Sequence, residues 1–330
     1  MRFFRAIVLG SACVAAGVAC GSFGSDTTPD PADAAPETTT IPDGDAPDAV
    51  GTDATTDAGA RCAVGAPFGA ATQLGGLGAY SVEAVRFSAN RAVVYLSLCP
   101  SDGGKPGCDM YQGTVTTTAD TYGSLVPMAG ANSPASYDSY PTVTGDAKYM
   151  FFGSSRNGSL KIYQSTAMGG VFVSPKTLQL PFSASNEPYL LADGRTFYFA
   201  ATESANPAQW DLYRAEGEAP TFSNPQKVPG VTVDQPQTGE YAPVPTEDEL
   251  EIFFASSRMP GSDNNFDMWT ASRASKTDDF GPAKRIDDLS GNQNEFPTSI
   301  SPDGCELYYI RKTGSGSGVG TAYVTRRQKP

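Results

Sequence analysis

Residues 241–259 read YAPVPTEDELEIFFASSRM, and this stretch decides the fold. A short apolar start leads into a polar turn, which is followed by a run of β-branched and aromatic residues and a small polar end. Runs of this kind, bounded by turn residues, are typical of paired β-strands. The same pattern recurs at residues 140–157 (YPTVTGDAKYMFFGSSRN), 187–203 (EPYLLADGRTFYFAATE) and 295–313 (EFPTSISPDGCELYYIRKT), and more faintly at 85–100 (VRFSANRAVVYLSLCP).

Three series of single residues recur in phase with this pattern. The turn position of each unit is occupied by Asn90, Asp146, Asp193, Asp248 and Asp303, at intervals of 56, 47, 55 and 55 residues. An aromatic residue ends each unit, in the series Tyr111, Tyr163, Tyr213, Trp269 and Tyr323. Another aromatic opens the next stretch, in the series Phe68, Tyr122, Phe172, Phe222 and Phe280. Five members in each series predict five structural repeats.

The repeats predict an all-β fold. Units of about 50 residues with four strand signals have the size of a propeller blade, and stacked blades close most simply into a ring. No stretch keeps a 3.6-residue apolar period with capping residues, so we expect very little helix. We therefore predict a five-bladed β-propeller with four-stranded antiparallel blades over residues 61–330.

Some motifs resemble those of a known family. Ser301-Pro-Asp-Gly304 followed by Leu307-Tyr-Tyr309 resembles the Pro-Asp repeat of TolB-like, WD-related propellers, and Ala255-Ser-Ser-Arg258 followed by Asp267-Met-Trp269 does so too. The resemblance covers roughly residues 80–327 and concerns the repeat alone. TolB has six blades and a different companion domain, so the resemblance implies no Tol-Pal role.

Ring closure and cysteine pairing are linked. Residues 68–74 match the stretch that follows each closing aromatic, yet no blade precedes them, so we predict that they form the outer strand of the last blade. Four cysteines of the predicted mature domain allow three pairings. Cys99 and Cys108 flank a short loop and predict a local bridge, which leaves Cys62 to join Cys305 across the closure. A metal site is the rival interpretation, but no Cys-x-x-Cys spacing supports it.

The N-terminal segment reads as an export signal. Residues 1–20 combine two arginines with a short run of small apolar residues. They end in Gly17-Val18-Ala19-Cys20, which resembles the processing site of bacterial lipoproteins, so we predict a lipid on Cys20. Cys13 is a poorer second candidate, and cleavage without lipidation is the other possibility. The expected location is the bacterial outer membrane, facing the periplasm or the cell surface, with the lipid as the only membrane contact.

Residues 21–60 predict a disordered tether. They consist mainly of Asp, Thr, Ala, Pro and Gly and carry nine acids without a Lys or Arg. Such a segment buries too little apolar surface to offset the entropy lost on ordering. Of the net charge of −13, the tether carries −9 and the signal +2, which leaves −6 for residues 61–330. A mildly acidic domain without a basic stripe argues against nucleic acid as a partner.

The chain contains no histidine. This excludes Ser-His-Asp and Cys-His catalysis and histidine-ligated metals. No glycine-rich phosphate loop follows a strand and opens a helix, and the glycine-rich run at residues 314–320 is read as a hairpin loop. The oxygen-rich run Asp263–Asp267 lacks the Gly and the distal Glu of an EF-hand and is read as a hairpin tip.

Carboxylates are the remaining candidates for chemistry. Asp138, Glu240 and Glu295 each lie eight residues before their turn position, and Glu187 lies six before it. Even offsets place all four on one face of the innermost strands, at one mouth of the ring's channel, whereas Glu83, seven before its turn position, has the opposite parity. Three interpretations stay open: a cation site, with Ca²⁺ as the only cofactor considered; a catalytic pair; or structural bonds to backbone or to a nearby arginine.

Two functions follow from these alternatives. We expect a binding or scaffolding module at the cell envelope, monomeric, with a protein, peptidoglycan or a glycan as ligand. The alternative is a carbohydrate-active hydrolase that uses the channel carboxylates. Equivalent acids in successive repeats favour binding, because catalytic carboxylates need different environments.

Overall fold

A computed structural model describes residues 61–101, 107–116, 121–122, 124–134, 136–203, 209–233, 238–258, 265–313 and 318–329. The predicted signal peptide (1–20) and tether (21–60) lie outside the described residues, so both stay predictions.

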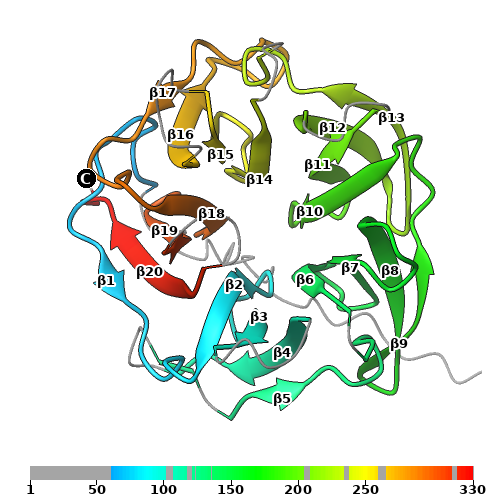
Figure 1. The fold of residues 1–330 in the computed structure, drawn as a ribbon. Coiled ribbons are helices and arrows are strands. Elements are labelled where there is room, and N and C mark those ends of the chain that lie inside the picture. Colours follow the sequence, from blue (N-terminus) through cyan, green and yellow to red (C-terminus); the bar gives the residue numbers. More distant parts are fainter. Residues whose placement is uncertain are drawn as a thin grey trace, which may run out of the picture. The chain divides into compact units, whose positions relative to one another are not determined.

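Five four-stranded antiparallel sheets form a ring of blades, which confirms the predicted fold (Figure 1). The first blade contains β2 (Tyr80–Phe87), β3 (Val93–Pro100), β4 (Asp109–Thr114) and β5 (Val126–Pro127). The second contains β6 (Asp138–Val143), β7 (Tyr149–Ser154), β8 (Lys161–Met168) and β9 (Val171–Thr177). The third contains β10 (Ala184–Leu190), β11 (Thr196–Thr202), β12 (Asp211–Glu218) and β13 (Thr221–Lys227). The fourth contains β14 (Glu240–Pro245), β15 (Glu251–Ser256), β16 (Asp267–Ser272) and β17 (Lys284–Arg285).

The fifth blade closes the ring. It contains β18 (Asn294–Ile300), β19 (Glu306–Lys312) and β20 (Gly320–Arg326), and its outermost strand is β1 (Thr72–Gln73) from the other end of the domain. Thr72 lies opposite Val324 in this antiparallel pair. The prediction that residues 68–74 supply this strand is confirmed.

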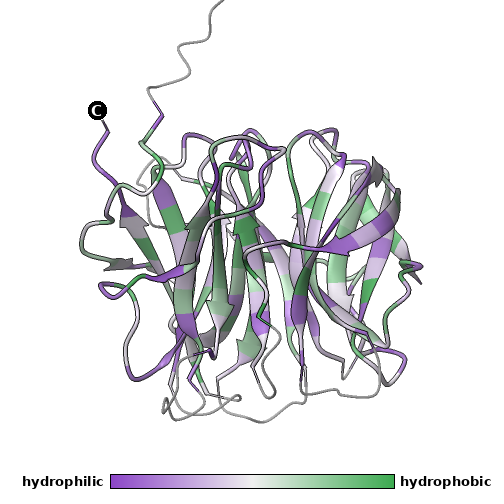
Figure 2. Cartoon of the chain, turned by 90° about the horizontal axis from the view of Figure 1, so that it is seen from above, coloured by the Kyte–Doolittle hydropathy of each residue, from purple (hydrophilic) through white to green (hydrophobic). Residues whose placement is uncertain are grey.

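The second strand of each blade carries most of the core. All seven residues of β11 and all six of β15 are buried, as expected for strands covered on both sides by neighbouring blades. Phe151, Phe197 and Phe222 pack ring to ring between the second and third blades, with centroids 4.5–5.4 Å apart. Hydrophobic residues lie along the strands, whereas many loops at both ends of the ring are hydrophilic (Figure 2).

The predicted turn positions are structurally equivalent. Asp248 accepts a hydrogen bond from the Thr246 hydroxyl (2.7 Å) and one from the backbone N–H of Leu250 (3.1 Å). Asn90, Asp146 and Asp303 repeat this arrangement with Ser88, Thr144 and Ser301. An Asp or Asn that bonds the backbone two residues further on stabilises a tight turn, which explains why the position recurs.

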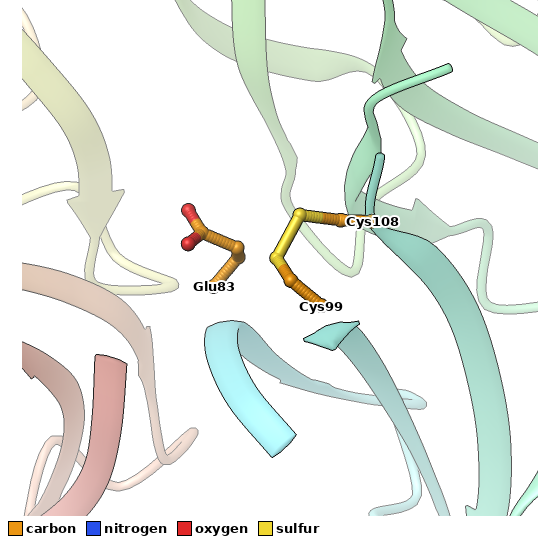
Figure 3. Close-up of side chains that lie close together, drawn as sticks. All are labelled: Glu83, Cys99 and Cys108. Carbon is orange, nitrogen blue, oxygen red and sulfur yellow. A yellow bond between two sulfur atoms is a disulfide. The ribbon is translucent and has the colours of Figure 1, made fainter. Parts of the chain in front are cut away.

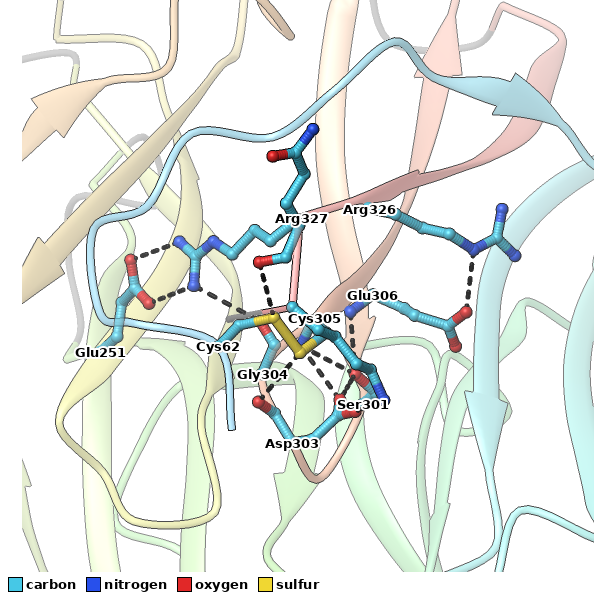
Figure 4. The surroundings of a disulfide bond; sticks show 11 residues. Cys62, Glu251, Ser301, Asp303, Gly304, Cys305, Glu306, Arg326 and Arg327 are labelled. Carbon is cyan, nitrogen blue, oxygen red and sulfur yellow. Dashed lines mark hydrogen bonds and ion pairs between the residues drawn. A yellow bond between two sulfur atoms is a disulfide. The ribbon is translucent and has the colours of Figure 1, made fainter. Parts of the chain in front are cut away.

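A disulfide between Cys62 and Cys305 fastens the closure, across 243 residues of sequence (Figure 4). Beside it, Arg327 of the last blade donates two hydrogen bonds to Glu251 of the fourth blade, at 2.7 and 2.8 Å. The second predicted bridge, between Cys99 and Cys108, joins the end of β3 to the residue before β4. Both predicted pairings are present.

No helix in the described part of the chain is long and apolar enough to cross a lipid bilayer.

Candidate functional site

The ring has two faces, and we name each by whether the innermost strands begin or end there. The innermost strands are β2, β6, β10, β14 and β18. On the start face these strands begin, and on the end face they end. Three of the acids predicted from the sequence occupy one equivalent position on the start face: Asp138, Glu240 and Glu295. Each lies opposite the last or next-to-last residue of the adjacent strand, as the pairing of Asp138 with Ser154 and of Glu240 with Ser256 shows.

Each of these acids is completely buried and paired with an arginine. Arg156 approaches Asp138 to 2.8 Å and Arg258 approaches Glu240 to 3.2 Å. The third pair lies in the last blade, where Arg311 Nε is 3.3 Å from Glu295 Oε1.

The arginines are also stacked on aromatic rings. The Arg258 guanidinium lies 4.9 Å from the centroid of Phe254 and 5.0 Å from that of Trp269. The equivalent stacks place Arg156 over Phe152 and Tyr163, and Arg311 over Tyr309 and Tyr323. The closing aromatic of the repeat is thus one wall of an acid–arginine–aromatic unit that recurs in three blades. Charge pairing and cation–π contact together stabilise the partly buried guanidinium.

Burial dominates the electrostatics of these acids. It raises the pKa of Glu240 to about 7, against the opposing effect of Arg258. It also raises the pKa of Glu295 to about 7, opposed by the backbone N–H of Gly291 and by Arg311.

Glu187 lies apart from the other three. It sits in the middle of β10 with a positive φ of 55°, where the register with β11 shifts. Its carboxylate accepts a hydrogen bond of 2.5 Å from the backbone N–H of Ala242 in the next blade. Burial raises its pKa to about 7. The structure therefore shows three equivalent acid–arginine pairs in three separate blades and one acid apart from them, and the binding role of all four acids stays a prediction.

Glu83 contacts start-face residues, although its side-chain parity along the strand predicted that it would point away from the face shared by the other four acids. It occupies the bulge of β2, between Val82 and Ala84, and a bulge reverses the alternation of side chains. Its carboxylate is 2.6 Å from Lys312 Nζ and accepts a 3.1 Å hydrogen bond from the Tyr137 hydroxyl.

The Glu83 carboxylate also lies within 4.8 Å of the sulfurs of Cys99 and Cys108 (Figure 3). Both sulfurs are consumed in the disulfide, so this group offers no thiolate to a metal. The calcium site considered from the sequence stays a prediction. Asp263 and Asn264 of the Asp263–Asp267 run lie outside the described residues.

A row of aromatic side chains crosses the start face and was missed by the sequence reasoning. The centroids of successive rings are 5.5, 5.1 and 5.5 Å apart in the order Trp210, Tyr241, Phe266 and Phe296. All four side chains are half-buried, and the row crosses the third, fourth and fifth blades. Lys312 Nζ lies 5.4 Å from the Phe296 centroid, so the row ends at the Lys312–Glu83 pair.

The sequence did contain a signal for this aromatic row. Trp210 and Phe266 each precede the Asp that opens a third strand, and Tyr241 and Phe296 each follow a start-face Glu. Only the ring geometry shows that these four positions are adjacent in space.

Comparison with known proteins shows a similarity of fold to several solved structures. The sequence matches no protein-family profile and no curated protein. Among solved structures, BT0996 in an RGII complex is similar over 80% of this chain and 90% of its own length, with a TM-score of 0.52 and 9% identity. TolB from Acinetobacter baumannii matches 75% of this chain but only 55% of its own length, at 16% identity and a TM-score of 0.48. Putative TolB from Agrobacterium tumefaciens matches 75% of each chain at 20% identity and a TM-score of 0.45. The class of protein is therefore a five-bladed β-propeller, and the likeness to these structures concerns the fold alone.

Proposed function

We propose that this protein is an exported binding module of the cell envelope, anchored by a lipid on Cys20, and that it binds a glycan on its start face. The row formed by Trp210, Tyr241, Phe266 and Phe296 carries the proposal. Aromatic side chains offer a large, rigid contact area at low entropic cost and dominate the energetics of many binding surfaces.

The chemistry around the row favours a sugar chain, of peptidoglycan or of another glycan. The apolar faces of sugar rings stack on aromatic rings, while their hydroxyls need hydrogen-bonding partners. Lys312 is partly exposed beside Phe296, and its ammonium keeps donors beyond the bond to Glu83, so it supplies such a group at one end of the row. A large protein partner would favour a contiguous apolar patch. The exposed large apolar residues in the described part of the chain are instead distributed over several elements, namely Val64, Val126, Met168, Val171 and Val319.

The contacts of the acids support binding over the hydrolase alternative. Glycoside hydrolysis needs two carboxyl groups that reach opposite sides of the glycosidic bond. Asp138, Glu240 and Glu295 are instead fully buried against arginines. Glu187 is buried against the backbone of the next blade, and Glu83 is paired with Lys312.

The first residues that the structure describes are fixed at the end face of the ring. Cys62 is bonded to the β18–β19 turn, and Arg61 forms an ion pair with Asp248 in the β14–β15 turn. Both turns lie on the end face. Residue 61 therefore joins the ring on the face opposite the proposed glycan surface.

Glycan binding is tested with the full chain carrying Cys20→Ser, which removes the lipidation site. We expect it to bind immobilised peptidoglycan or a member of a glycan array, and Trp210→Ala and Tyr241→Ala each to weaken binding by about tenfold or more. Tyr149→Ala is the matched control, because Tyr149 is a half-buried aromatic at the end-face terminus of β7. Unchanged binding in both start-face variants would exclude the row as the ligand surface. If the protein captured an envelope protein and bound no glycan, the ligand would be a protein and the glycan proposal would be wrong.

The anchor is tested separately. Mass spectrometry of the mature N-terminal peptide should show a lipid-modified Cys20, and wild-type protein should fractionate with membranes while Cys20→Ser becomes soluble. An unmodified N-terminus, or a soluble wild type, would show that the signal is cleaved without lipidation.

A further inference from the structure

Arg86 in β2 is a buried cation without a hydrogen-bonding partner. Its side chain is 3% exposed, and none of its three guanidinium nitrogens has a partner among the residues that the structure describes. Its guanidinium stacks on the side chain of Tyr189, 4.3 Å from the centroid of the aromatic ring, on the other side of the propeller's central axis. Burial lowers its pKa to about 10, so the side chain is still charged at neutral pH. A buried charge without a partner is strongly unfavourable, and a native structure rarely retains one without a function.

Arg86 lies on an innermost strand, beside a cavity at the centre of the propeller that opens toward the end face. Each innermost strand contributes the residue four positions before its turn position, namely Arg86, Thr142, Tyr189, Val244 and Ser299. All of these except Val244 line a cavity of about 160 Å³. The Ser299 hydroxyl is also buried without a hydrogen-bonding partner among the described residues. A guanidinium and a hydroxyl thus line one cavity with unused hydrogen-bonding capacity.

The other charged groups near the cavity are already engaged. Arg91 contacts Glu306 at 2.9 Å and donates to the Tyr308 hydroxyl at 2.8 Å. Glu247 accepts a 3.0 Å hydrogen bond from the backbone N–H of Ala192. Glu187, the acid that acts on Arg86 electrostatically, is held by the Ala242 N–H. These contacts leave the Arg86 guanidinium as the group that still needs an anion.

We infer that this cavity is a binding site for a small organic monocarboxylate, held by Arg86 and Ser299. A guanidinium fork matches the two oxygens of a carboxylate. Phe87, Leu190 and Ile300 in the lining offer contact to a short apolar chain. The nearby carboxyl groups of Glu187 and Glu247 disfavour a second negative charge, so a monocarboxylate fits better than a phosphate dianion. The inference stands independently of the glycan proposal, because the cavity opens on the opposite face and involves none of the aromatic row.

The test uses the full chain with Cys20→Ser and follows binding by calorimetry and thermal shift at constant ionic strength. The probes are acetate, butanoate, neutral butanamide, inorganic phosphate and chloride. We expect butanoate to bind more tightly than acetate, and butanamide and chloride to have no effect. Phosphate binding as tight as butanoate would overturn the choice of a monocarboxylate. Butanoate indistinguishable from chloride would overturn the site.

Variants assign the binding to the cavity. Arg86→Gln should weaken butanoate binding tenfold or more, since it removes the charge-assisted bond, and Ser299→Ala should weaken it by a few-fold. Arg195→Gln is the matched control, because Arg195 is a largely exposed arginine of the β10–β11 turn and should leave binding unchanged. Should Arg86→Gln fail to fold, Ser299→Ala and the comparison of butanoate with butanamide still decide the matter. Unchanged affinity in Ser299→Ala, together with equal response to butanoate and butanamide, would refute the inference.

Discussion

Charge is arranged differently on the two faces of the ring. On the start face, each of the three equivalent buried acids has its own arginine, and each arginine has its own aromatic pair. Toward the end face, Arg86 is buried without an acid and occurs in one blade only, since the equivalent residues are Thr142, Tyr189, Val244 and Ser299.

The difference helps to separate structural from functional residues in a repeat fold. A repeated acid–arginine–aromatic unit is internally neutral and stabilises every blade in which it occurs. A polar residue that departs from the repeat and lacks a partner has no such structural explanation. Arg86 departs from the repeat, and its whole guanidinium lacks a hydrogen-bonding partner among the described residues, so a functional role is better supported for Arg86 than for the repeated acids.

The two disulfides also lie on opposite faces of the ring, and removing them should have the largest effect on stability. Cys62–Cys305, on the end face, closes 243 residues, whereas Cys99–Cys108, on the start face, closes nine. The chain-entropy model gives about 5.5 kcal/mol for the long bridge and about 2.6 kcal/mol for the short one, as upper values. Replacing Cys62 and Cys305 by Ala should thus lower the free energy of unfolding by roughly 3 kcal/mol more than replacing Cys99 and Cys108.

Urea unfolding of the two double variants measures this difference. Hydrogen exchange adds a local readout, because only the variant without Cys62–Cys305 should lose protection at the β1–β20 pair, Thr72 with Val324 and Gln73 with Tyr323. Equal destabilisation with unchanged exchange at β1 would mean that the strand pairing alone holds the ring closed.

Removing Arg258 and removing Arg86 should have opposite consequences for stability. Arg258→Gln leaves the buried Glu240 carboxylate without its cation, which costs about 3–5 kcal/mol in comparable buried pairs. Arg86→Gln removes an unpaired buried charge and should be neutral or stabilising in the absence of ligand. Thermal melts at pH 8 compare the two variants directly. A loss of stability in Arg86→Gln as large as that in Arg258→Gln would show that Arg86 has a structural partner after all.

The fold could be predicted from the sequence because its determinants are local and repeated five times. The turn residues, the closing aromatics and the apolar second strands each lie within one blade, so every copy reinforces the same prediction. Ring closure was predictable for the same reason, since residues 68–74 match a strand that was missing elsewhere.

The site was harder to predict because its determinants lie in different blades. Side-chain parity was counted along strands that contain bulges, and the bulge at Glu83 turned that carboxylate toward Lys312 against the expectation. Trp210 and Phe296 belong to different repeats, and no sequence spacing shows that they belong to one aromatic row. Arg86 could not be predicted as a site residue, because nothing in the sequence shows that a charged residue lacks a partner.

A pH dependence tests the three acids whose pKa is raised by burial, Glu187, Glu240 and Glu295. Burial raises the pKa of Glu187, Glu240 and Glu295 to about 7, from about 4.5 in the unfolded chain. Between pH 4.5 and 7 the folded protein therefore binds more protons than the unfolded chain, and stability should fall as the pH rises through this window. Acids with lowered pKa, such as Glu306, act in the opposite sense but only as the pH falls below about 4.5.

Glu187→Gln isolates one of these contributions. A glutamine imitates the protonated acid and can still accept the hydrogen bond from Ala242. The variant should match the wild type in stability at pH 5 and exceed it by roughly 2–3 kcal/mol at pH 8, because only the wild type must then lose a favourably bound proton. Glu218→Gln, at an exposed position, should leave the difference between pH 5 and pH 8 as it is in the wild type. A Glu187→Gln variant that is less stable than the wild type at pH 8 would show that the ionised carboxylate is the form the fold requires, and Glu187 would then have to be counted as a partner of Arg86.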